Sequence, residues 1–442
     1  MKDLDLKLND ENIKFVLKND FINRNKYISS FIKMLSNINE NRIICLDGEW
    51  GSGKTWFVKS VEYLINTDNN KELKVVKDEI MQKVKDEYMT FYYNAWENDD
   101  AASAMLSLIY KLINDSCNQK ENNEVGPIPR LLNTVIKYAT NGNLDIKQDL
   151  FGEQWNNKQI TDSIKTSEEI KLTFREIIDN ILIEQKNRLL IIIDEIDRCK
   201  PLFAIDLLEN IKHFYNDDRI VFLITTNNRQ LSSSVNKVYG ENYDGALYLD
   251  RFFDITIELP NNYLSQYIKA IDDGSTSNNY SFRTLRELAK EYKLTMREYN
   301  RYYNAMKIIN EDLIDDYSYI SLYINYFVVP LAMLLKIKNK NDYYKFIEGK
   351  NVDVLKKIIE TNEYFLKLGR KIVSLYDNQI IIDIHSMPIS EEKKSGKEKD
   401  KILNLLEIFY NQLFNGEIIE EDDEWIYKEM LNTTLEMISL LK

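Results

Sequence analysis

A short glycine-rich segment constrains this chain more than any other feature. Residues 48–55 read Gly-Glu-Trp-Gly-Ser-Gly-Lys-Thr, which fits the pattern G-x-x-x-x-G-K-[ST]. The apolar run 42–47 before it is typical of a buried strand, and 56–65 after it has helical spacing. Glycines at such a junction let backbone N–H groups surround a phosphate at the positive end of a helix. The chain has only 13 glycines in 442 residues, so three within six positions favour a phosphate-binding loop over a chance match.

The residue types in this loop predict specific contacts with a nucleotide. Lys54 is expected to bridge the β- and γ-phosphates, and the Thr55 hydroxyl is expected to bind Mg²⁺. Backbone N–H groups of the loop and of the first helical turn are expected to surround the phosphates. The candidate nucleotide-binding residues are Gly48, Glu49, Trp50, Gly51, Ser52, Gly53, Lys54, Thr55 and Trp56.

A second apolar run ends in two carboxylates. Residues 189–193 are continuously apolar, and Asp194 and Glu195 follow them. A buried parallel strand that ends in an acidic residue places its carboxylate at the carboxyl edge of the sheet, facing the Mg²⁺ shell. We therefore expect Asp194 to be a metal ligand and Glu195 to orient and deprotonate the attacking water. Two alternatives stay open: an acidic N-cap ahead of the helix at Pro201, and Asp197 as the base.

Strands alternate with helices over the first 260 residues. Besides the two apolar runs, residues 88–93, 220–225 and 254–259 are predicted to be strands, and helical patterns lie between them. Such alternation is typical of an α/β fold in which helices cover both faces of a parallel sheet. After Pro260 only helical patterns follow.

These shifts in pattern predict the organisation of the chain. We expect an NTPase-type α/β core over residues 1–260, with a polar, strand-free insertion at about 114–165. A helical lid is expected over 261–345, and a C-terminal helical region over 346–442. The charged tract 390–400 is predicted to be a loop within that region.

Composition argues against several other classes of protein. The chain has three Cys without a Cys-x-x-Cys pair and two His, which excludes a disulfide scaffold and argues against zinc sites. Its 58 Lys and Arg against 71 Asp and Glu give a net charge of −13. That balance argues against coating bulk nucleic acid, although a local basic channel stays open.

Targeting signals are not evident in the sequence. The N-terminus alternates charge and lacks the apolar stretch of a signal peptide. The most apolar window, residues 319–335, is shorter than the about 20 residues that span a bilayer, and it contains Pro330. We interpret it as a buried pair of helices kinked at Pro330, and we expect a soluble cytoplasmic protein without membrane association.

Three motifs together resemble the KAP family of P-loop NTPases. They are Gly48–Thr55, Tyr93-Asn-Ala-Trp-Glu97 and Ile193-Asp-Glu-Ile-Asp-Arg-Cys-Lys-Pro201. Downstream, Tyr248-Leu-Asp-Arg251 and the segment 295–301 are similar to two further family motifs, so the resemblance covers about residues 10–310. It implies a sheet of strand order 5-1-4-3-2 followed by a helical lid, and ATP hydrolysis with Mg²⁺.

Some positions depart from the family pattern. Many members have two Asp where this chain has Asp194 and Glu195, which brings it nearer the general ATPase pattern, and Arg251 replaces a usual Lys. Some members carry membrane helices within the NTPase domain, whereas the insertion here is polar. Bacterial members include defence-associated proteins and animal members are signalling scaffolds. The resemblance therefore makes bacterial antiphage defence the best expectation for the biological role.

Three residues outside the main motifs are further catalytic candidates. Asn227 ends the strand beside the catalytic one and could sense the γ-phosphate, with ordinary turn chemistry as the alternative. Arg251 could act as an arginine finger on a neighbouring subunit, with a salt-bridged surface arginine as the alternative. Arg297 could fold from the lid onto the γ-phosphate.

Several other residues carry weaker expectations. We expect Trp96 to belong to the core, and Phe21 and Arg24 could border the adenine. The segment Asn339-Lys-Asn-Asp342 matches the guanine-reading N-K-x-D pattern. It follows a helical run instead of a core strand, so we expect ATP and not GTP to be the substrate.

Together these inferences predict a Mg²⁺-dependent ATPase that couples ATP binding and hydrolysis to conformational change or assembly. We expect a homo-oligomer with a protein partner or effector. Two alternatives stay open. One is a slow nucleotide-gated switch that grips a protein partner, and the other is a nucleic-acid-stimulated motor, which the charge of −13 disfavours.

Overall fold

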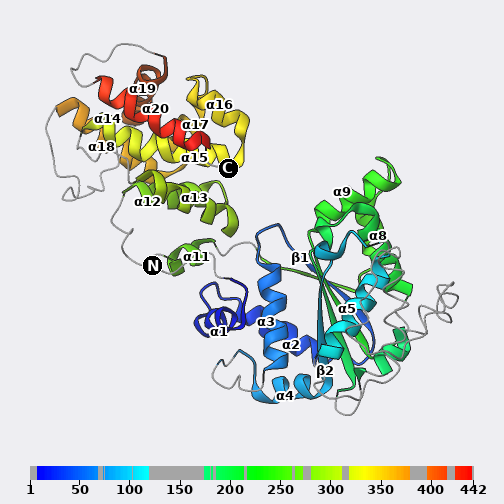
Figure 1. Cartoon of the computed structure of the whole chain (residues 1–442). Coiled ribbons are helices and arrows are strands. Elements are labelled where there is room, and N and C mark those ends of the chain that lie inside the picture. Colours follow the sequence, from blue (N-terminus) through cyan, green and yellow to red (C-terminus); the bar gives the residue numbers. More distant parts are fainter. Residues whose placement is uncertain are drawn as a thin grey trace, which may run out of the picture. The chain divides into compact units, whose positions relative to one another are not determined.

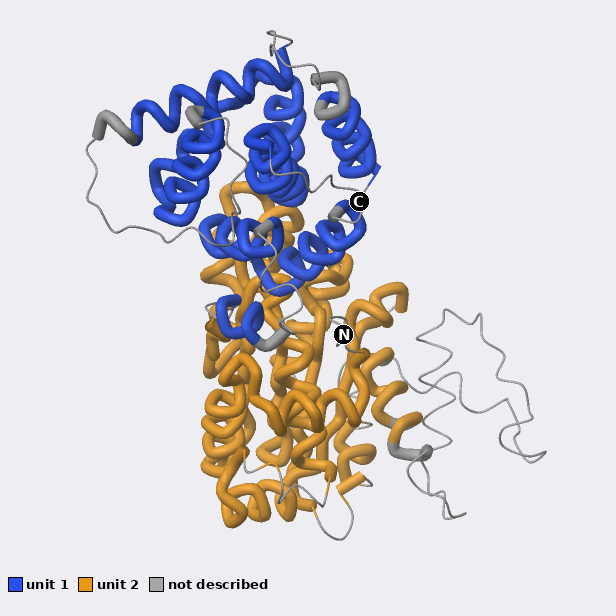
Figure 2. The backbone as a smooth tube through the Cα atoms, turned by 90° about the vertical axis from the view of Figure 1, so that its left-hand side faces the viewer, with its two compact units in different colours: residues 1–6, 262–442 blue, residues 7–261 orange. Residues whose placement is uncertain are grey.

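The chain forms two compact units in the computed structural model. The sheet unit spans Lys7–Asn261 and the helical unit spans Asn262–Lys442 (Figure 2). The structure describes residues 7–67, 73, 75–101, 103–118, 174–179, 181–182, 186–213, 217–260, 264–271, 280–310, 318–378, 396–415 and 424–440. From residue 119 onward, the insertion predicted at 114–165 lies outside the described residues.

Five parallel strands form the sheet of the first unit (Figure 1). They are β1 (Arg42–Asp47), β2 (Tyr88–Asn94), β3 (Arg188–Asp194), β4 (Ile220–Thr226) and β5 (Ile255–Glu258). Their spatial order is β2-β3-β4-β1-β5, which confirms the predicted order 5-1-4-3-2. All residues of β3 and β4 are buried, because these strands lie inside the sheet and helices cover both of its faces.

Helices pack on both faces of the sheet (Figure 1). Those of this unit are α1 (Asp10–Asn19), α2 (Asn25–Leu35), α3 (Lys54–Asn66), α4 (Asp78–Glu87), α5 (Ala104–Asn118), α8 (Pro201–His213), α9 (Asn228–Tyr239) and α10 (Gly245–Asp250). Alternate residues of a strand face opposite sides, so Ile192 and Leu223 join the core under α1–α4. Ile191 and Ile224 join the core under α5, α8 and α9. The predicted α/β class is therefore confirmed.

The second unit consists of helices in its described residues. They are α11 (Leu264–Ile271), α12 (Tyr280–Glu291), α13 (Met296–Asn310), α14 (Tyr319–Tyr323), a π-helix (Ile324–Val328), α15 (Val329–Lys338), α16 (Lys340–Ile347), α17 (Asp353–Thr361), α18 (Glu363–Asn378), α19 (Gly396–Asn415) and α20 (Glu424–Leu440). One hydrophobic core includes Leu285, Phe327, Phe365 and Leu431. Helices of the predicted lid and of the predicted C-terminal region thus share a core.

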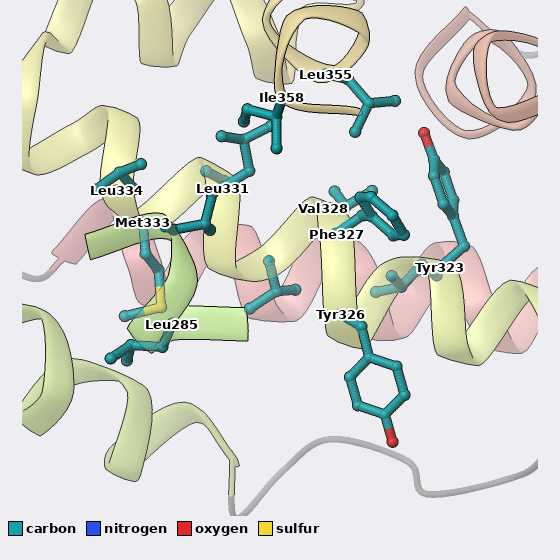
Figure 3. Close-up of a cluster of buried hydrophobic side chains, with 14 of the residues drawn as sticks. Leu285, Tyr323, Tyr326, Phe327, Val328, Leu331, Met333, Leu334, Leu355 and Ile358 are labelled. Atoms are coloured by element: carbon teal, nitrogen blue, oxygen red, sulfur yellow. The ribbon is translucent and has the colours of Figure 1, made fainter. Parts of the chain in front are cut away.

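The most apolar window lies within this core (Figure 3). Tyr319–Lys338 is the one candidate among the described residues that is long and apolar enough to cross a membrane, and 83% of its window is buried inside the protein. The predicted pair of kinked helices is wrong in one respect, because α14, the π-helix and α15 follow one another without a break. Five residues of π-helix directly precede α15, whose first turn holds Pro330, and this wider turn accommodates the ring and its missing N–H.

Two further predictions change in this unit. The charged tract 390–400 is not a loop throughout, because Gly396–Asp400 begin α19. Residues 390–395 lie outside the described residues. Asn339 of the guanine-like segment is the N-cap of α16, and its side chain accepts from the backbone N–H groups of Asn341 and Asp342. That segment is therefore a helix cap.

Candidate nucleotide-binding site

The glycine-rich loop connects β1 to α3 in the geometry that phosphate binding requires. Gly51 and Gly53 have φ values of +81° and +85°, in the left-handed region that favours glycine. Gly48 N–H donates to the carbonyl of Thr226 at 3.1 Å, which attaches the start of the loop to β4. The loop ends at Lys54, the first residue of the 13-residue helix α3. Its backbone therefore lies at the positive end of a helix dipole.

Lys54 is folded into this loop. Its side chain is buried, and its Nζ donates to the carbonyls of Gly48 at 2.5 Å and Glu49 at 3.3 Å. Burial lowers the pKa of Lys54, and the charges of Asp197 and Asp194 oppose that shift. The ammonium group is thus within electrostatic reach of the acidic segment that follows β3.

Arg24 supports the loop from behind. Its guanidinium is buried and donates to the carbonyls of Ser52 and Gly53, the latter at 3.0 Å. A Cβ on Gly53 would lie 2.7 Å from Arg24 Nη1, so a side chain at this position would displace the guanidinium. The contacts of Arg24 are thus those of a loop support, and a role for Phe21 or Arg24 at the adenine stays a prediction.

Asp194 lies at the end of β3 with both carboxylate oxygens engaged. It is 1% exposed. Thr225 Oγ1 and the Glu195 N–H donate to its Oδ1, the latter at 3.0 Å, and the Tyr92 hydroxyl donates to its Oδ2 at 2.9 Å. Burial and the charge of Asp194 raise the pKa of the Tyr92 hydroxyl well above its usual range, so this hydroxyl remains a donor. The strands on either side of β3 therefore fix the orientation of Asp194.

Sequence reasoning missed Tyr92 and Thr225. Tyr92 lies near the end of β2 and Thr225 near the end of β4, the two strands that flank β3, and the register that pairs Asn94 with Asp194 brings them next to Asp194. The predicted strand order already makes β2 and β4 the neighbours of β3, so it is the signal that could have identified them. The register, which also decides which side chains meet Asp194, was not part of the prediction.

Glu195 follows Asp194 in an unusual backbone conformation. Its φ is +61°, which is rare for a residue with a side chain and marks strain of the kind found at functional sites. Its Oε1 forms an ion pair with Arg198 Nη1 at 2.8 Å. Burial raises the pKa of Glu195, and Arg198 opposes this shift. A raised pKa improves a carboxylate as a general base.

Asp197 lies in the short 3₁₀ turn η4 (Ile196–Arg198) and contacts the glycine-rich loop. Its Oδ2 accepts a hydrogen bond of 2.5 Å from Trp50 Nε1–H. Asp197 is mostly buried, whereas the Trp50 side chain is 45% exposed. The sequence did not predict this contact, because the two residues are 147 positions apart.

Two buried hydroxyl groups beside the loop have no hydrogen-bond partner among the described residues. They belong to Ser52, within the loop, and to Thr226, at the end of β4 beside Asp47. Buried polar atoms are nearly always hydrogen-bonded in folded proteins, so an unpartnered hydroxyl within the loop fits a site for a polar ligand. Thr55 lies in the first turn of α3, directly after Lys54.

The other predicted residues have different surroundings. Asn227 is the N-cap of α9, and its Oδ1 accepts from Gln230 N–H at 3.3 Å, so ordinary capping is what the structure shows for it. Arg251 is exposed at the end of α10 and forms no ion pair with the described residues. Arg297 is exposed on α13 of the helical unit. Roles for these three in catalysis stay predictions.

Of the two tryptophans Trp56 and Trp96, the second is more exposed than the sequence predicts. Trp96 is 50% exposed, so its assignment to the core is wrong. It begins the 3₁₀ turn Trp96–Asn98 after β2, and the Arg198 guanidinium lies 5.4 Å from the centroid of its ring. Trp56 packs partly buried against the core beneath α3.

The comparisons with known proteins agree with this geometry. A glycine-rich loop between β1 and α3, opposite an acidic pair at the end of β3, defines the class of P-loop NTPases, which bind and hydrolyse nucleoside triphosphates. The model of the KAP family P-loop domain matches residues 24–313, and the chain belongs to this family.

Two other comparisons add little. Among solved structures, the Orc1 protein of Aeropyrum pernix in complex with DNA is similar at 12% identity and a TM-score of 0.36. That match covers 97% of this chain and 87% of the other. No curated protein matches the chain.

Proposed function

We propose that this chain is a Mg²⁺-dependent ATPase that couples ATP binding and hydrolysis to a conformational change or to assembly. One observation carries the proposal. The loop that holds Lys54 follows β1 and the carboxylates of Asp194 and Glu195 follow β3 at the same carboxyl edge of one parallel sheet, and a hydrogen bond of 2.5 Å from Trp50 to Asp197 joins the two segments. Phosphate binding and water activation need these groups at that edge.

The residues at this edge fit a Mg²⁺ ion. Asp194 and Thr55 would supply the hard oxygen ligands that Mg²⁺ prefers, and the unpartnered hydroxyl of Ser52 leaves polar capacity within the loop. No group of three or more His, Cys, Asp or Glu that could hold a metal occurs in the described part of the chain. This suits Mg²⁺ beside a nucleotide, because such sites use one or two protein ligands together with phosphates and water. Bound Mg²⁺ would neutralise phosphate charge in the transition state.

The protein's own residues divide the remaining work. Lys54 would exchange the carbonyls of Gly48 and Glu49 for β- and γ-phosphate oxygens, which is a stronger, charge-assisted interaction. Glu195 would accept a proton from the attacking water. Its Oε2 is the oxygen left for this role, because the ion pair with Arg198 engages Oε1. Asn227, Arg251 and Arg297 are proposed to act on the γ-phosphate in addition.

The Glu195–Arg198 ion pair favours one alternative function. The arginine 2.8 Å from Glu195 Oε1 lowers the pKa of this carboxylate and makes it a weaker base, so turnover would be slower while the pair is closed. A slow switch, which binds ATP and releases a partner on hydrolysis, would use that delay. ATP-dependent assembly with turnover near background would favour the switch over the ATPase.

The biological assignments rest on the resemblance to KAP proteins. We propose a cytoplasmic homo-oligomer that acts on a protein partner in bacterial antiphage defence. A substrate preference for ATP over GTP is part of the proposal, because the only guanine-like segment noted in the sequence caps α16 through Asn339. Competition binding in which GTP binds tighter than ATP would contradict that preference.

Phosphate release by the purified full-length chain tests the proposal. We expect turnover that requires Mg²⁺ and that is lost in Lys54→Ala, because this change removes the cation expected to hold the β- and γ-phosphates. Lys14→Ala is the matched control, since Lys14 is an exposed lysine of α1 in the same unit. A folded Lys54→Ala variant that hydrolyses ATP at the parent rate would overturn the proposal.

A further inference from the structure

Trp50 connects the phosphate-binding loop to the acidic segment after β3. The bond from its indole N–H to Asp197 is 2.5 Å long, and it is the contact by which a loop side chain reaches that segment. The ring is 45% exposed, while Asp197 is 9% exposed. Burial of apolar surface does not account for a tryptophan at this position, because nearly half of its side chain is exposed to water. Its contribution to the loop is the indole N–H group that donates to Asp197.

The turn that Trp50 contacts is short and held at several points. Ile196 is fully buried in the core. At the other end, Arg198 N–H donates to the Glu195 carbonyl at 3.1 Å, and the Arg198 guanidinium pairs with the Glu195 carboxylate. Because the turn has only three residues, the backbone of Asp197 cannot shift without moving Arg198 or the strained backbone of Glu195. The positions of Asp197 and of the candidate base are therefore coupled.

We propose that Trp50 is a positioning residue for hydrolysis, whose hydrogen bond to Asp197 fixes the turn Ile196–Arg198 and thereby holds Glu195 at the phosphate-binding loop. This inference rests on the proposed function, because it assigns Trp50 a part in the turnover that Glu195 drives. Nucleotide affinity comes mainly from the loop backbone and Lys54. Loss of the Trp50–Asp197 bond therefore lowers kcat more than it weakens binding.

Two substitutions at Asp197 distinguish its role as the hydrogen-bond acceptor of Trp50 from a role as a base. Asp197→Asn keeps an oxygen that accepts from the Trp50 indole but cannot act as a base. Asp197→Leu removes both properties at similar size. If Asp197 serves as the acceptor, Asp197→Asn retains turnover and Asp197→Leu does not.

The experiment measures kcat by phosphate release and Kd with a fluorescent ATP analogue. It compares the full-length parent with Trp50→Phe, Asp197→Asn, Asp197→Leu and the double variant Trp50→Phe/Asp197→Leu. Tyr239→Phe is the matched control, because it removes another half-exposed aromatic donor to a carboxylate, that of Glu209 at 3.1 Å, in the same unit. Melting temperatures establish that each variant is folded, and the two Asp197 variants suffice if Trp50→Phe does not fold.

We expect Trp50→Phe and Asp197→Leu each to lower kcat about 10-fold, the loss typical of a hydrogen bond to a charged group, with little change in Kd. The double variant should be no slower than either single variant, because one bond is lost in all three. Asp197→Asn and Tyr239→Phe should stay near the parent.

Each other outcome has a definite meaning. Parent-like kcat in Trp50→Phe, additive losses in the double variant, or an Asp197→Asn as slow as Asp197→Leu would overturn the positioning role while leaving the ATPase standing. A parent that binds the ATP analogue without hydrolysing ATP would overturn the proposed function, and the positioning role would fall with it.

Discussion

The sheet unit and the helical unit use buried polar side chains in different ways. In the sheet unit one group of them converges at the carboxyl ends of the strands, while others, such as Tyr88 and Arg188, bind backbone carbonyls. Thr225 and Tyr92 hold Asp194 from the two neighbouring strands. The buried hydroxyls of Ser52 and Thr226 have no partner among the described residues, and they lie at that same edge.

In the helical unit, two buried tyrosines instead bind the backbone, although the buried Tyr343 hydroxyl has no partner among the described residues. The Tyr302 hydroxyl donates to the carbonyl of Pro330 at 2.7 Å, and the Tyr323 hydroxyl donates to the carbonyl of Leu406 at 3.0 Å. Each bond joins two helices that are far apart in sequence. Burial raises the pKa of both hydroxyls well above the usual range, so they stay protonated donors.

The difference separates a site from a scaffold. Polar groups that satisfy one another across helices stabilise a packing, whereas convergent groups with spare hydrogen-bonding capacity fit a ligand. The strained backbone of Glu195 lies in the sheet unit too, with φ of +61°. We therefore expect substitutions of convergent groups to change chemistry and substitutions in the helical unit to change stability.

The largest effect tests whether the site of the sheet unit is complete in one subunit. If Arg251 completes a neighbour's site, Arg251→Ala should lower turnover by about 10³-fold, as loss of an arginine finger does. Its exposure, without an ion pair to the described residues, leaves it able to reach another subunit. Specific activity measured against protein concentration should rise, and mixing Arg251→Ala with Lys54→Ala subunits should restore part of it.

The matched control for that experiment is Arg229→Ala, because Arg229 is another exposed arginine of the same unit, on α9. Light scattering that shows a monomer with and without ATP, together with turnover independent of concentration, would contradict an action in trans. The site of the sheet unit would then be complete by itself.

A second prediction concerns the base. Glu195→Gln should slow hydrolysis by roughly 10²-fold or more and leave ATP bound, because the change removes the proton acceptor and keeps the size of the side chain. The readouts are single-turnover kinetics and retention of labelled ATP on the protein. Asp197→Asn is the comparison variant; normal hydrolysis in Glu195→Gln with loss in Asp197→Asn would move the base to Asp197.

Much of this site could be predicted from the sequence, because its signals are local. The glycine pattern, the apolar run before it and the acidic pair after 189–193 each lie within a few consecutive residues, and helix and strand periodicity places them on the fold. The five strands were predicted for the same reason, whereas their order was implied by the resemblance to the KAP family; both are confirmed.

The contacts between these segments could not be predicted in the same way. Trp50 meets Asp197 across 147 positions, and Thr225 meets Asp194 across 31, so both contacts depend on register and on the path of loops. Trp96 was assigned to the core because of its size, but it begins a turn beyond the end of β2 and stays half exposed. The position of Trp96 in this turn, and not the size of its side chain, decides its exposure.

A third prediction tests whether the residues around Asp194 tune metal binding. Tyr92→Phe and Thr225→Val should each raise the Mg²⁺ concentration for half-maximal turnover by about tenfold, because partners that orient a metal ligand matter on this scale. Tyr93→Phe is the matched control, since Tyr93 is adjacent on β2 but donates to Ser107 on the other face of the sheet at 2.9 Å. An equal shift in all three variants would mean a general effect on the strand instead of on the ligand.

The smallest effect tests the helical unit as a scaffold. Tyr302→Phe removes the hydroxyl that donates to the carbonyl of Pro330. The free energy of unfolding should fall by about 1 kcal/mol, the net contribution of a typical hydrogen bond, while the Kd for ATP should stay at the parent value. Urea denaturation and nucleotide titration of the same samples check both, with Tyr344→Phe as the control because Tyr344 is 55% exposed. If Tyr302→Phe keeps the parent stability but changes the affinity for ATP, the contrast between the two units is wrong. A buried tyrosine far from the glycine-rich loop in sequence would then contribute to nucleotide binding.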